Sequence, residues 1–167
     1  TCMLVIGIDP GTATTGYGVI EENSNGDFRT IDYGVISTAA DQPLEERLKT
    51  IYDQMTSLIL LHKPQSGAVE KLFFKQNVTN AISVGQARGV VLLAMVTNGV
   101  SVHEYSPAEV KSAVSGYGNA EKSQIQAMVK AILCLDDIPR PDDAADALAI
   151  AICHLNSSGI LNLRSEG

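Results

Sequence analysis

Residues 3–37 read MLVIGIDPGTATTGYGVIEENSNGDFRTIDYGVIS, and this stretch predicts the sheet on which the rest of the fold is built. Its apolar, β-branched segments, Met3–Asp9, Gly16–Glu22 and Phe28–Ser37, are typical of β-strands. The sequence NSNGD at 23–27 consists of residues that form the turn of a hairpin. The stretch therefore predicts an antiparallel meander of three strands.

Helices and strands alternate after this meander. Apolar residues spaced three and four apart predict a helix over Pro43–Leu61, with Pro43 at its first position. The order of the elements predicts an α/β fold with a mixed five-stranded sheet and helices on both faces. With 167 residues and no linker or repeat, the chain 1–167 is expected to form a single domain. The other predicted elements are strands at Gly67–Glu70 and Val100–Tyr105, and helices at Asn77–Thr97, Pro107–Ser115, Glu121–Leu133 and Pro141–Asn156.

Four acidic residues fall where these elements can deliver them to one point. Asp9 and Glu70 each close a predicted strand, and open α/β sheets bind ligands at the carboxyl ends of their strands. Asp143 and Asp146 are three residues apart at the start of a predicted helix, so they share one helix face. Carboxylates gathered in this way repel one another unless a hard cation that prefers oxygen neutralises them. The four residues therefore predict a divalent-metal site, and Mg²⁺ fits them best.

Each acid also has an ordinary structural interpretation. Asp9 precedes Pro-Gly, where aspartate commonly forms a turn. Asp143 and Asp146 stand where acids favour the positive end of a helix. Asp142 could replace Asp143 as a ligand, although the spacing of Asp143-Ala144-Ala145-Asp146 favours Asp143.

Composition bears on the partner and on the compartment. The formal net charge of -7 argues against a nucleic-acid partner, because phosphate binding depends on Lys and Arg. A cluster of metal-binding acids inflates the negative count, so the distribution of the 12 basic residues must decide. Three cysteines without paired spacing, and no signal peptide or long apolar span before the first strand, favour a reducing cytoplasm and no membrane. His62, His103 and His154 also lack paired spacing and are expected to be surface or hydrogen-bonded residues.

Several segments become recognisable when they are taken together: GIDPGT at 7–12, Val69-Glu70, GQARG at 85–89, AEKSQ at 120–124 and DAADALA at 143–149. In this order and spacing they resemble the RuvC family of bacterial Holliday junction resolvases, from Met3 to about Leu155. The resemblance implies an RNase H-like fold, a homodimer and an endonuclease that nicks two opposed strands of a four-way DNA junction. It assigns catalysis and metal binding to the four acids, with two Mg²⁺ ions per active site and Mn²⁺ as a substitute. It also implies RuvA and RuvB, the branch-migration complex, as partners.

The resemblance assigns further residues to catalysis and to DNA. Lys122 matches a catalytic lysine that contacts phosphate or stabilises the transition state, and Lys111 matches a second cation at the cleft. Phe73 matches an aromatic residue that stacks on a base at the junction centre, although the sequence leaves Phe74 open for that role. Without the resemblance, the lysines would be interpreted as solvated charges and the phenylalanines as core residues. Other candidate DNA contacts are Lys71 and Lys75, which flank the aromatic pair, and Arg88, which could instead pair with a carboxylate.

Three other functions are compatible with parts of the sequence. Asp9–Thr14 resembles the phosphate-binding hairpin of actin-like and sugar-kinase phosphotransferases, but 167 residues leave no room for the second domain those enzymes need. A metal-free junction-binding protein would keep the acids as structural groups. Another RNase H-like nuclease, acting on RNA or on a different branched DNA, would share the metal chemistry and differ in dimer geometry. The long helix at Asn77–Thr97 is expected to form part of the dimer interface.

Overall fold

A computed structural model describes residues 2–72 and 78–165 of the chain, with the backbone alone for 159–165. Its five-stranded sheet has the order β3-β2-β1-β4-β5. β1 pairs antiparallel with β2 and parallel with β4, so the sheet is mixed, as predicted. The strands are β1 (Met3–Asp9), β2 (Thr14–Glu22), β3 (Phe28–Ser37), β4 (Ser66–Glu70) and β5 (Ser101–Tyr105). The helices are α1 (Leu44–His62), α2 (Val78–Thr97), α3 (Pro107–Ser115), α4 (Lys122–Ile132) and α5 (Asp142–Ser165).

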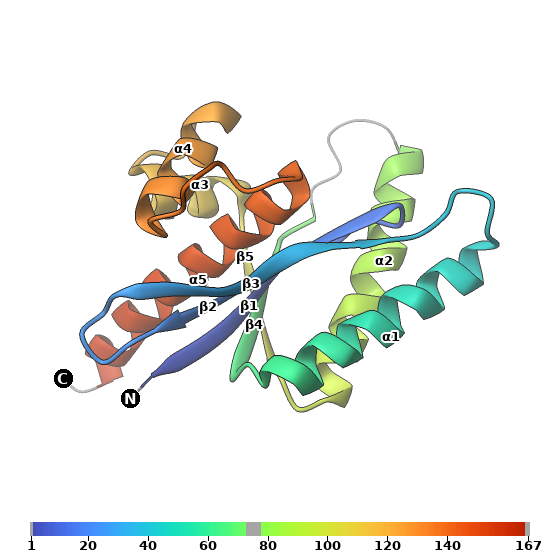
Figure 1. The fold of residues 1–167 in the computed structure, drawn as a ribbon, viewed down its shortest axis with the longest axis horizontal. Helices are drawn as coiled ribbons and strands as arrows, with labels where there is room; N and C mark the ends of the chain where they lie inside the picture. Colours follow the sequence, from blue (N-terminus) through green and yellow to red (C-terminus); the bar gives the residue numbers. More distant parts are fainter. Residues whose placement is uncertain (1, 73–77, 166–167) are drawn as a thin grey trace.

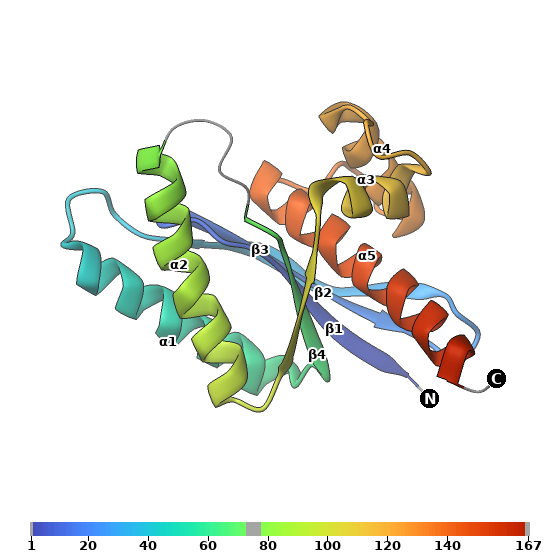
Figure 2. The same cartoon turned by 180° about the vertical axis from the view of Figure 1, so that it is seen from behind.

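Helices cover both faces of the sheet, which confirms the predicted layers (Figure 1). α1 and α2 lie on one side, and α5 crosses the other side with α3 and α4 beyond it (Figures 1 and 2). Each side has its own core. Ile6 and Ile8 pack with Met95 on the α2 side, whereas Val5 packs with Leu148 on the α5 side. Neighbouring residues of β1 therefore serve opposite cores, because successive strand side chains alternate between the two faces.

Glycines let α5 approach the sheet closely. Gly7 on β1 and Gly16 on β2 face the backbone of α5, and a Cβ atom at either position would clash with that helix. At Gly16 the clash would be with the carbonyl group of Asp143. Gly16 is also the register partner of Asp9. The absence of a side chain at Gly16 therefore brings the start of α5 next to the end of β1.

The predicted boundaries agree closely with the structure except at α5. This helix does not stop at Asn156 but continues to Ser165. It continues through Ser157 and Ser158, whose hydroxyl groups donate to carbonyl oxygens one turn earlier: Ser157 to Cys153 at 2.8 Å and Ser158 to His154 at 2.9 Å.

The predicted start of α1 is one residue early. The sequence placed Pro43 at the first helical position, whereas in the structure Pro43 is the N-cap, directly before the helix. The predicted start of the next helix, Asn77, lies outside the described residues.

α2 carries an exposed apolar strip. The side chains of Val78, Ile82, Leu93 and Val96 are 57% to 73% exposed and, with Gly89, lie on one face of the helix. Among the described helices, α2 is also long and apolar enough to cross a membrane, by length and composition alone. Length and composition carry little weight by themselves, since helices of soluble proteins meet the same criteria. A contiguous apolar strip of this kind is typical of an interaction surface.

Candidate metal centre

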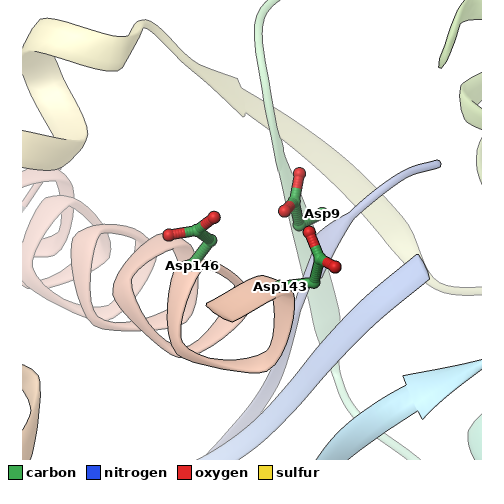
Figure 3. A group of neighbouring side chains, drawn as sticks. All are labelled: Asp9, Asp143 and Asp146. Atoms are coloured by element: carbon green, nitrogen blue, oxygen red, sulfur yellow. The ribbon is translucent and has the colours of Figure 1, made fainter. Parts of the chain in front are cut away.

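Three carboxylates meet where β1 and α5 converge (Figure 3). Asp9 closes β1, whereas Asp143 and Asp146 lie in the first two turns of α5. One carboxylate oxygen from each residue lies within 4.8 Å of the other two. A strand and a helix that are far apart in the sequence thus deliver three of the four predicted acids to one point.

Glu70 reaches the same cleft from the neighbouring strand. β4 runs parallel to β1 with Ile8 opposite Val69, so the two strands end side by side. This arrangement confirms that Asp9 and Glu70 close neighbouring strands. Among the described residues, the group within 4.8 Å does not include Glu70. Its side chain nevertheless lines the cleft that Asp9 and Asp146 also line.

Burial and mutual repulsion raise the pKa values of these acids. Burial, followed by the charges of Asp146 and Asp143, raises the pKa of Asp9 to about 8. Burial and then the charge of Asp146 raise the pKa of Glu70. Burial is also the main reason that the pKa of Asp146 is raised. Without a cation, the cluster therefore holds a proton at neutral pH.

This donor set fits a hard divalent cation. The grouped atoms of Asp9, Asp143 and Asp146 are all carboxylate oxygens. Mg²⁺, Mn²⁺ and Ca²⁺ prefer such oxygens, whereas softer metals favour imidazole and thiolate. The raised pKa of Asp9 agrees with this assignment, because carboxylates at this spacing are stable as anions only beside a positive charge. These three residues could hold the metal directly, with Glu70 completing the set at the cleft.

A cleft of about 300 Å³ opens beside the acids. Val110, Ile125 and Ile150 contribute apolar surface to it from α3, α4 and α5. Lys111 and Lys122 line it together with the acids. The structure thus places both lysines at the cleft, where the sequence analysis expected them, and their contact with DNA stays a prediction.

Asp142 is separate from the acid cluster. Its carboxylate pairs with the Lys122 amino group at 3.0 Å and accepts a hydrogen bond from Gln126 at 3.1 Å. Adjacent helical residues point about 100° apart, so Asp142 faces α4 while Asp143 faces Asp9. Of the two aspartates that the sequence left open as ligands, the structure places Asp143 in the cluster.

Arg88 is buried inside the protein. Its guanidinium group donates to the backbone carbonyl of Glu70 at 2.8 Å and to the carboxylate of Glu104 at 2.5 Å. The residue is only 9% exposed. The structure therefore favours pairing with a carboxylate over contact with DNA, the other role predicted for Arg88. By bonding the Glu70 carbonyl, Arg88 also fixes the backbone that carries one of the candidate ligands.

The remaining predicted DNA contacts lie just after β4. Lys71 is exposed and directly follows Glu70. Phe73, Phe74 and Lys75 lie outside the described residues, so their roles stay predictions.

Hydroxyl groups to which the sequence analysis gave no role hold the turn after Asp9. Thr15 Oγ1 donates to the carbonyl oxygen of Gly11 at 2.7 Å, within the turn. Thr12 Oγ1 donates to the carbonyl oxygen of Ser83 on α2 at 2.9 Å, and Thr12 is 5% exposed. The threonine-rich composition of residues 11–15 was a usable signal for the first bond. Nothing in the sequence indicated Ser83 as the partner in the second.

A second polar cluster lies further along α5, at His154. Its Nε2 atom is 2.7 Å from Ser66 Oγ, and its Nδ1 atom is 2.7 Å from the hydroxyl of Tyr105. The ring of His103 lies against it, with the ring centroids 4.6 Å apart. Burial, followed by the charge of His103, lowers the pKa of His154 to about 4. His154 is therefore a neutral core residue, and the structure confirms the expectation that it is hydrogen-bonded.

Comparison with known proteins connects this geometry to a family. Residues 5–154 match the family model described as crossover junction endodeoxyribonuclease RuvC. The chain belongs to the RuvC family. The RuvC protein of Desulfitobacterium hafniense is 56% identical to it over 160 residues, which cover 96% of each chain. That of Caldicellulosiruptor saccharolyticus is 48% identical over 165 residues, which cover 98% of this chain and 99% of the relative.

Solved structures agree with this assignment. Thermus thermophilus RuvC matches with a TM-score of 0.88 at 38% identity, covering 95% of this chain and 96% of the other. The same protein in complex with a Holliday junction substrate also matches with a TM-score of 0.88, covering 93% and 94%. This similarity confirms the predicted RNase H-like fold. The yeast mitochondrial Holliday junction resolvase Ydc2 shares the fold at 15% identity, with a TM-score of 0.61.

Proposed function

We propose that this chain is a Holliday junction resolvase, an endonuclease that nicks two opposed strands of a four-way DNA junction in recombination and repair. The observation that carries the proposal is the group formed by Asp9, Asp143 and Asp146. Their carboxylate oxygens lie within 4.8 Å of one another in a chain of the RuvC family. Clustered oxygen ligands beside an open cleft with two lysines suit hydrolysis of a phosphodiester.

We propose Mg²⁺ as the cofactor, with two ions per active site and Mn²⁺ as a substitute. Asp9, Glu70, Asp143 and Asp146 would hold the ions. When bound, the metal supplies a water nucleophile at neutral pH and positive charge for the leaving oxygen. The protein contributes anionic oxygens that bind tightly only after losing a shared proton, because the pKa of Asp9 is raised to about 8.

We propose that the lysines of the cleft bind phosphate. Lys122 is the first residue of α4 and lines the cleft with Asp9 and Asp146. Its hydrogen bond to Asp142 raises its pKa, so the amino group is charged at neutral pH. Lys111 lines the same cleft from α3 and supplies the second cation. Each would neutralise the DNA backbone near the bond that breaks.

The segment after β4 is proposed to contact the centre of the junction. Lys71 directly follows the metal-site residue Glu70 and is exposed, so the chain leaves the cleft with a cation at its edge. Phe73 is proposed to stack on a base, with Lys75 beside it in the sequence. A ring and flanking cations suit an opened junction, in which bases are accessible for stacking.

We propose a homodimer that uses α2. The exposed strip of Val78, Ile82, Leu93 and Val96 supports this surface, since an interface covers such side chains. Cutting two opposed strands needs two active sites, which a two-fold pair of subunits supplies. A Leu93→Lys variant should therefore sediment as a monomer, whereas Gln54→Lys on the exposed face of α1 should not change the mass in solution. Monomeric wild type would reject this interface.

The proposal has three further parts. Residues 1–167 act as one nuclease domain. One sheet, covered on its two faces by helices from both halves of the chain, supports this proposal. The enzyme works on DNA in the cytoplasm. RuvA and RuvB are its branch-migration partners, supported by membership of the family.

The alternative functions have less support. In a phosphotransferase hairpin the Thr12 hydroxyl would be free for phosphate, but here it donates to the Ser83 carbonyl and is buried. A metal-free junction-binding protein gives no reason to gather three carboxylates whose repulsion contributes to a pKa of about 8 at Asp9. Another RNase H-like nuclease would share the metal chemistry and differ in dimer geometry and therefore in substrate, so the substrate is what the experiment must vary.

The decisive experiment is cleavage of a labelled synthetic four-way junction, with a linear duplex of matched sequence as the control substrate. Wild type and Asp9→Asn are compared with and without Mg²⁺. Symmetric nicks that require Mg²⁺, occur at the junction and disappear in the variant are the expected result. Equal cutting of the duplex would identify a different nuclease of this fold. Binding of the junction without cutting in any divalent metal, over a panel of junction sequences, would favour the non-cleaving protein.

A further inference from the structure

We propose that Asp142 is a positioning residue for cleavage, which holds Lys122 at the metal cleft through an ion pair across two helix starts. This inference rests on the proposed nuclease function and on the proposed phosphate-binding role of Lys122. The carrying contact is the 3.0 Å ion pair between the Lys122 amino group and the Asp142 carboxylate. Asp142 stands outside the acid cluster, so its role differs from that of the metal-site acids.

The contact joins the starts of two helices that also pack together in one hydrophobic core. Lys122 is the first residue of α4, and Asp142 is the first residue of α5. Gln126, one turn further along α4, donates to the other oxygen of Asp142 at 3.1 Å. One carboxylate is therefore held by two side chains of α4, one turn apart. This arrangement fixes the start of α4, and with it Lys122, relative to the helix that carries Asp143 and Asp146.

Asp142 reaches α4 because of its position next to a metal-site residue. Asp143 turns toward Asp9, and the helical rotation of about 100° per residue turns Asp142 toward Lys122. The same first turn of α5 thus presents one acid to the metal site and one to the lysine. The ion pair thus relates the position of Lys122 to the helix that carries the acid cluster.

The ion pair contributes little to the stability of the fold. The side chains of Lys122 and Asp142 are 57% and 64% exposed. Exposed pairs of this kind gain little because water screens them and the two side chains lose freedom. The pair is better explained by what it positions. Lys122 lines the cleft with Asp9, Glu70 and Asp146, where the scissile phosphate is proposed to lie.

The first measurement is the single-turnover rate at saturating junction and Mg²⁺ for wild type and Asp142→Asn. Asn keeps the size of the side chain and an oxygen for Gln126 but loses the charge. We expect the rate to fall about two- to fivefold, the change that the loss of one exposed ion pair produces. The Mg²⁺ concentration for half-maximal rate should stay within twofold of wild type. An unchanged or faster rate would overturn the proposal, and a larger shift in Mg²⁺ dependence would show that Asp142 acts on the metal-site acids instead.

Two control variants separate the ion pair from general effects of charge. Asp137→Asn removes an exposed acid from the loop between α4 and α5. Asp53→Asn breaks an exposed pair of similar kind, in which Lys49 and Asp53 lie 2.6 Å apart on α1. Both controls should cut at the wild-type rate. If Asp137→Asn slows cleavage as much as Asp142→Asn, the effect is one of overall charge and the proposal fails.

A double-mutant cycle tests whether Asp142 acts through Lys122. Lys122→Gln alone should cut more slowly than Asp142→Asn alone. In the Lys122→Gln background, Asp142→Asn should cause no further loss, because the group that it positions is already gone. A further loss of the same factor would show that Asp142 acts independently of Lys122 and would overturn the assignment.

A readout without DNA or metal separates this proposal from the proposed function. The labelling rate of Lys122 by an amine-reactive reagent, followed by peptide mass spectrometry, should rise in Asp142→Asn relative to Lys49 in the same sample. Loss of the pair frees the amino group and makes it easier to deprotonate. Unchanged labelling would overturn the ion pair in solution. If Lys122 is labelled faster in Asp142→Asn but wild type cuts no junction, the ion pair is confirmed and the nuclease function is rejected.

Discussion

Two polar clusters on α5 differ in whether their buried groups have partners. At its start, Asp143 and Asp146 face Asp9, and burial with repulsion raises the pKa of Asp9 to about 8. Further along, His154 bonds Ser66 and the Tyr105 hydroxyl at 2.7 Å each, and its pKa falls to about 4. Both clusters link α5 to strand residues on the sheet. The carboxylates of the acid cluster repel one another, whereas each ring nitrogen of His154 has a hydrogen-bond partner.

This difference separates residues kept for chemistry from residues kept for the fold. A buried polar group that has its hydrogen-bond partners stabilises the native state. Buried acids without a counter-charge destabilise it and are expected where a ligand supplies that charge. The acid cluster at the start of α5 should therefore destabilise the fold when no metal is bound. The His154 cluster should stabilise the fold near neutral pH with or without metal.

The largest expected effect is on cleavage by Asp9→Asn. Losing this anionic ligand should lower the single-turnover rate by about 100- to 1,000-fold, since metal-assisted catalysis contributes several kcal/mol. Without metal, the same variant should be more stable than wild type by at least about 1 kcal/mol, or roughly 2–4 °C in melting temperature. Thermal denaturation and junction cleavage measure the two effects.

Asp41→Asn is the matched control for Asp9→Asn, because Asp41 is an exposed acid in the loop before α1. It should leave both the cleavage rate and the melting temperature unchanged. A metal-free Asp9→Asn protein that melts below wild type would contradict the distinction drawn between the two clusters.

The largest effect on stability is expected for His154→Ala. Removing the ring leaves the Ser66 and Tyr105 hydroxyls without their partner in a site where His154 is 1% exposed. The free energy of unfolding should fall by about 2–4 kcal/mol, from the cavity and the unpaired groups together. Urea denaturation measures this loss. His103→Ala removes only an exposed stacking partner and should lower the free energy of unfolding far less. An equal loss for His103→Ala and His154→Ala would show that the contact between the two rings, and not the hydrogen bonds, provides the stability.

Acid should affect the two clusters with opposite sign. For Asp9 the folded pKa of about 8 exceeds the usual value of 3.8, so the metal-free protein should lose stability as pH rises through this window. For His154 the folded pKa of about 4 lies below the usual 6.5, so its contribution is full above pH 6.5 and declines as pH falls toward 4. The His154 contribution that acid removes is on the order of 3 kcal/mol.

Urea denaturation of three proteins between pH 8 and pH 4.5 tests these signs. Asp9→Asn should show a flatter dependence than wild type at the alkaline end. Below about pH 6.5 the two groups act with opposite sign in wild type, so His154→Ala should there lose stability more steeply than wild type as pH rises. Parallel curves for all three proteins would show that neither group controls the response to pH.

The smallest expected effect is that of Ser66→Ala. It removes one of the two hydrogen bonds of His154 and leaves the other, with Tyr105, in place. The loss should be about 1 kcal/mol, or roughly 2–4 °C. Tyr105→Phe is the symmetrical change and should give a similar value. A much larger loss from Ser66→Ala would mean that the hydroxyl supports β4 directly.

The sequence carried most of the fold because its strong signals are local. The apolar run from Met3 to Ile8 predicts a strand, and β1 has the predicted bounds, Met3–Asp9. The pattern of Ser106 followed by Glu109 is likewise local, and it forms a capping box at the start of α3. The end of α5 was predicted nine residues early relative to Ser165, because Asn156, Ser157 and Ser158 are weak helix formers and local sequence does not indicate that the helix continues through them.

For the site, the sequence determined the set of acids and the family resemblance, since residue type and order are its own properties. The tertiary structure decided which groups meet. It placed Asp143 with Asp9 and turned Asp142 toward Lys122, and it paired the buried Arg88 with Glu104. The first outcome depends on the close approach of α5 at Gly16, which brings Asp143 to Asp9, more than a hundred positions earlier in the chain. The second depends on the rotation of α5, which turns Asp142 away from Asp143. The type of a residue sets which interactions its side chain can make, and long-range packing sets which partner it meets.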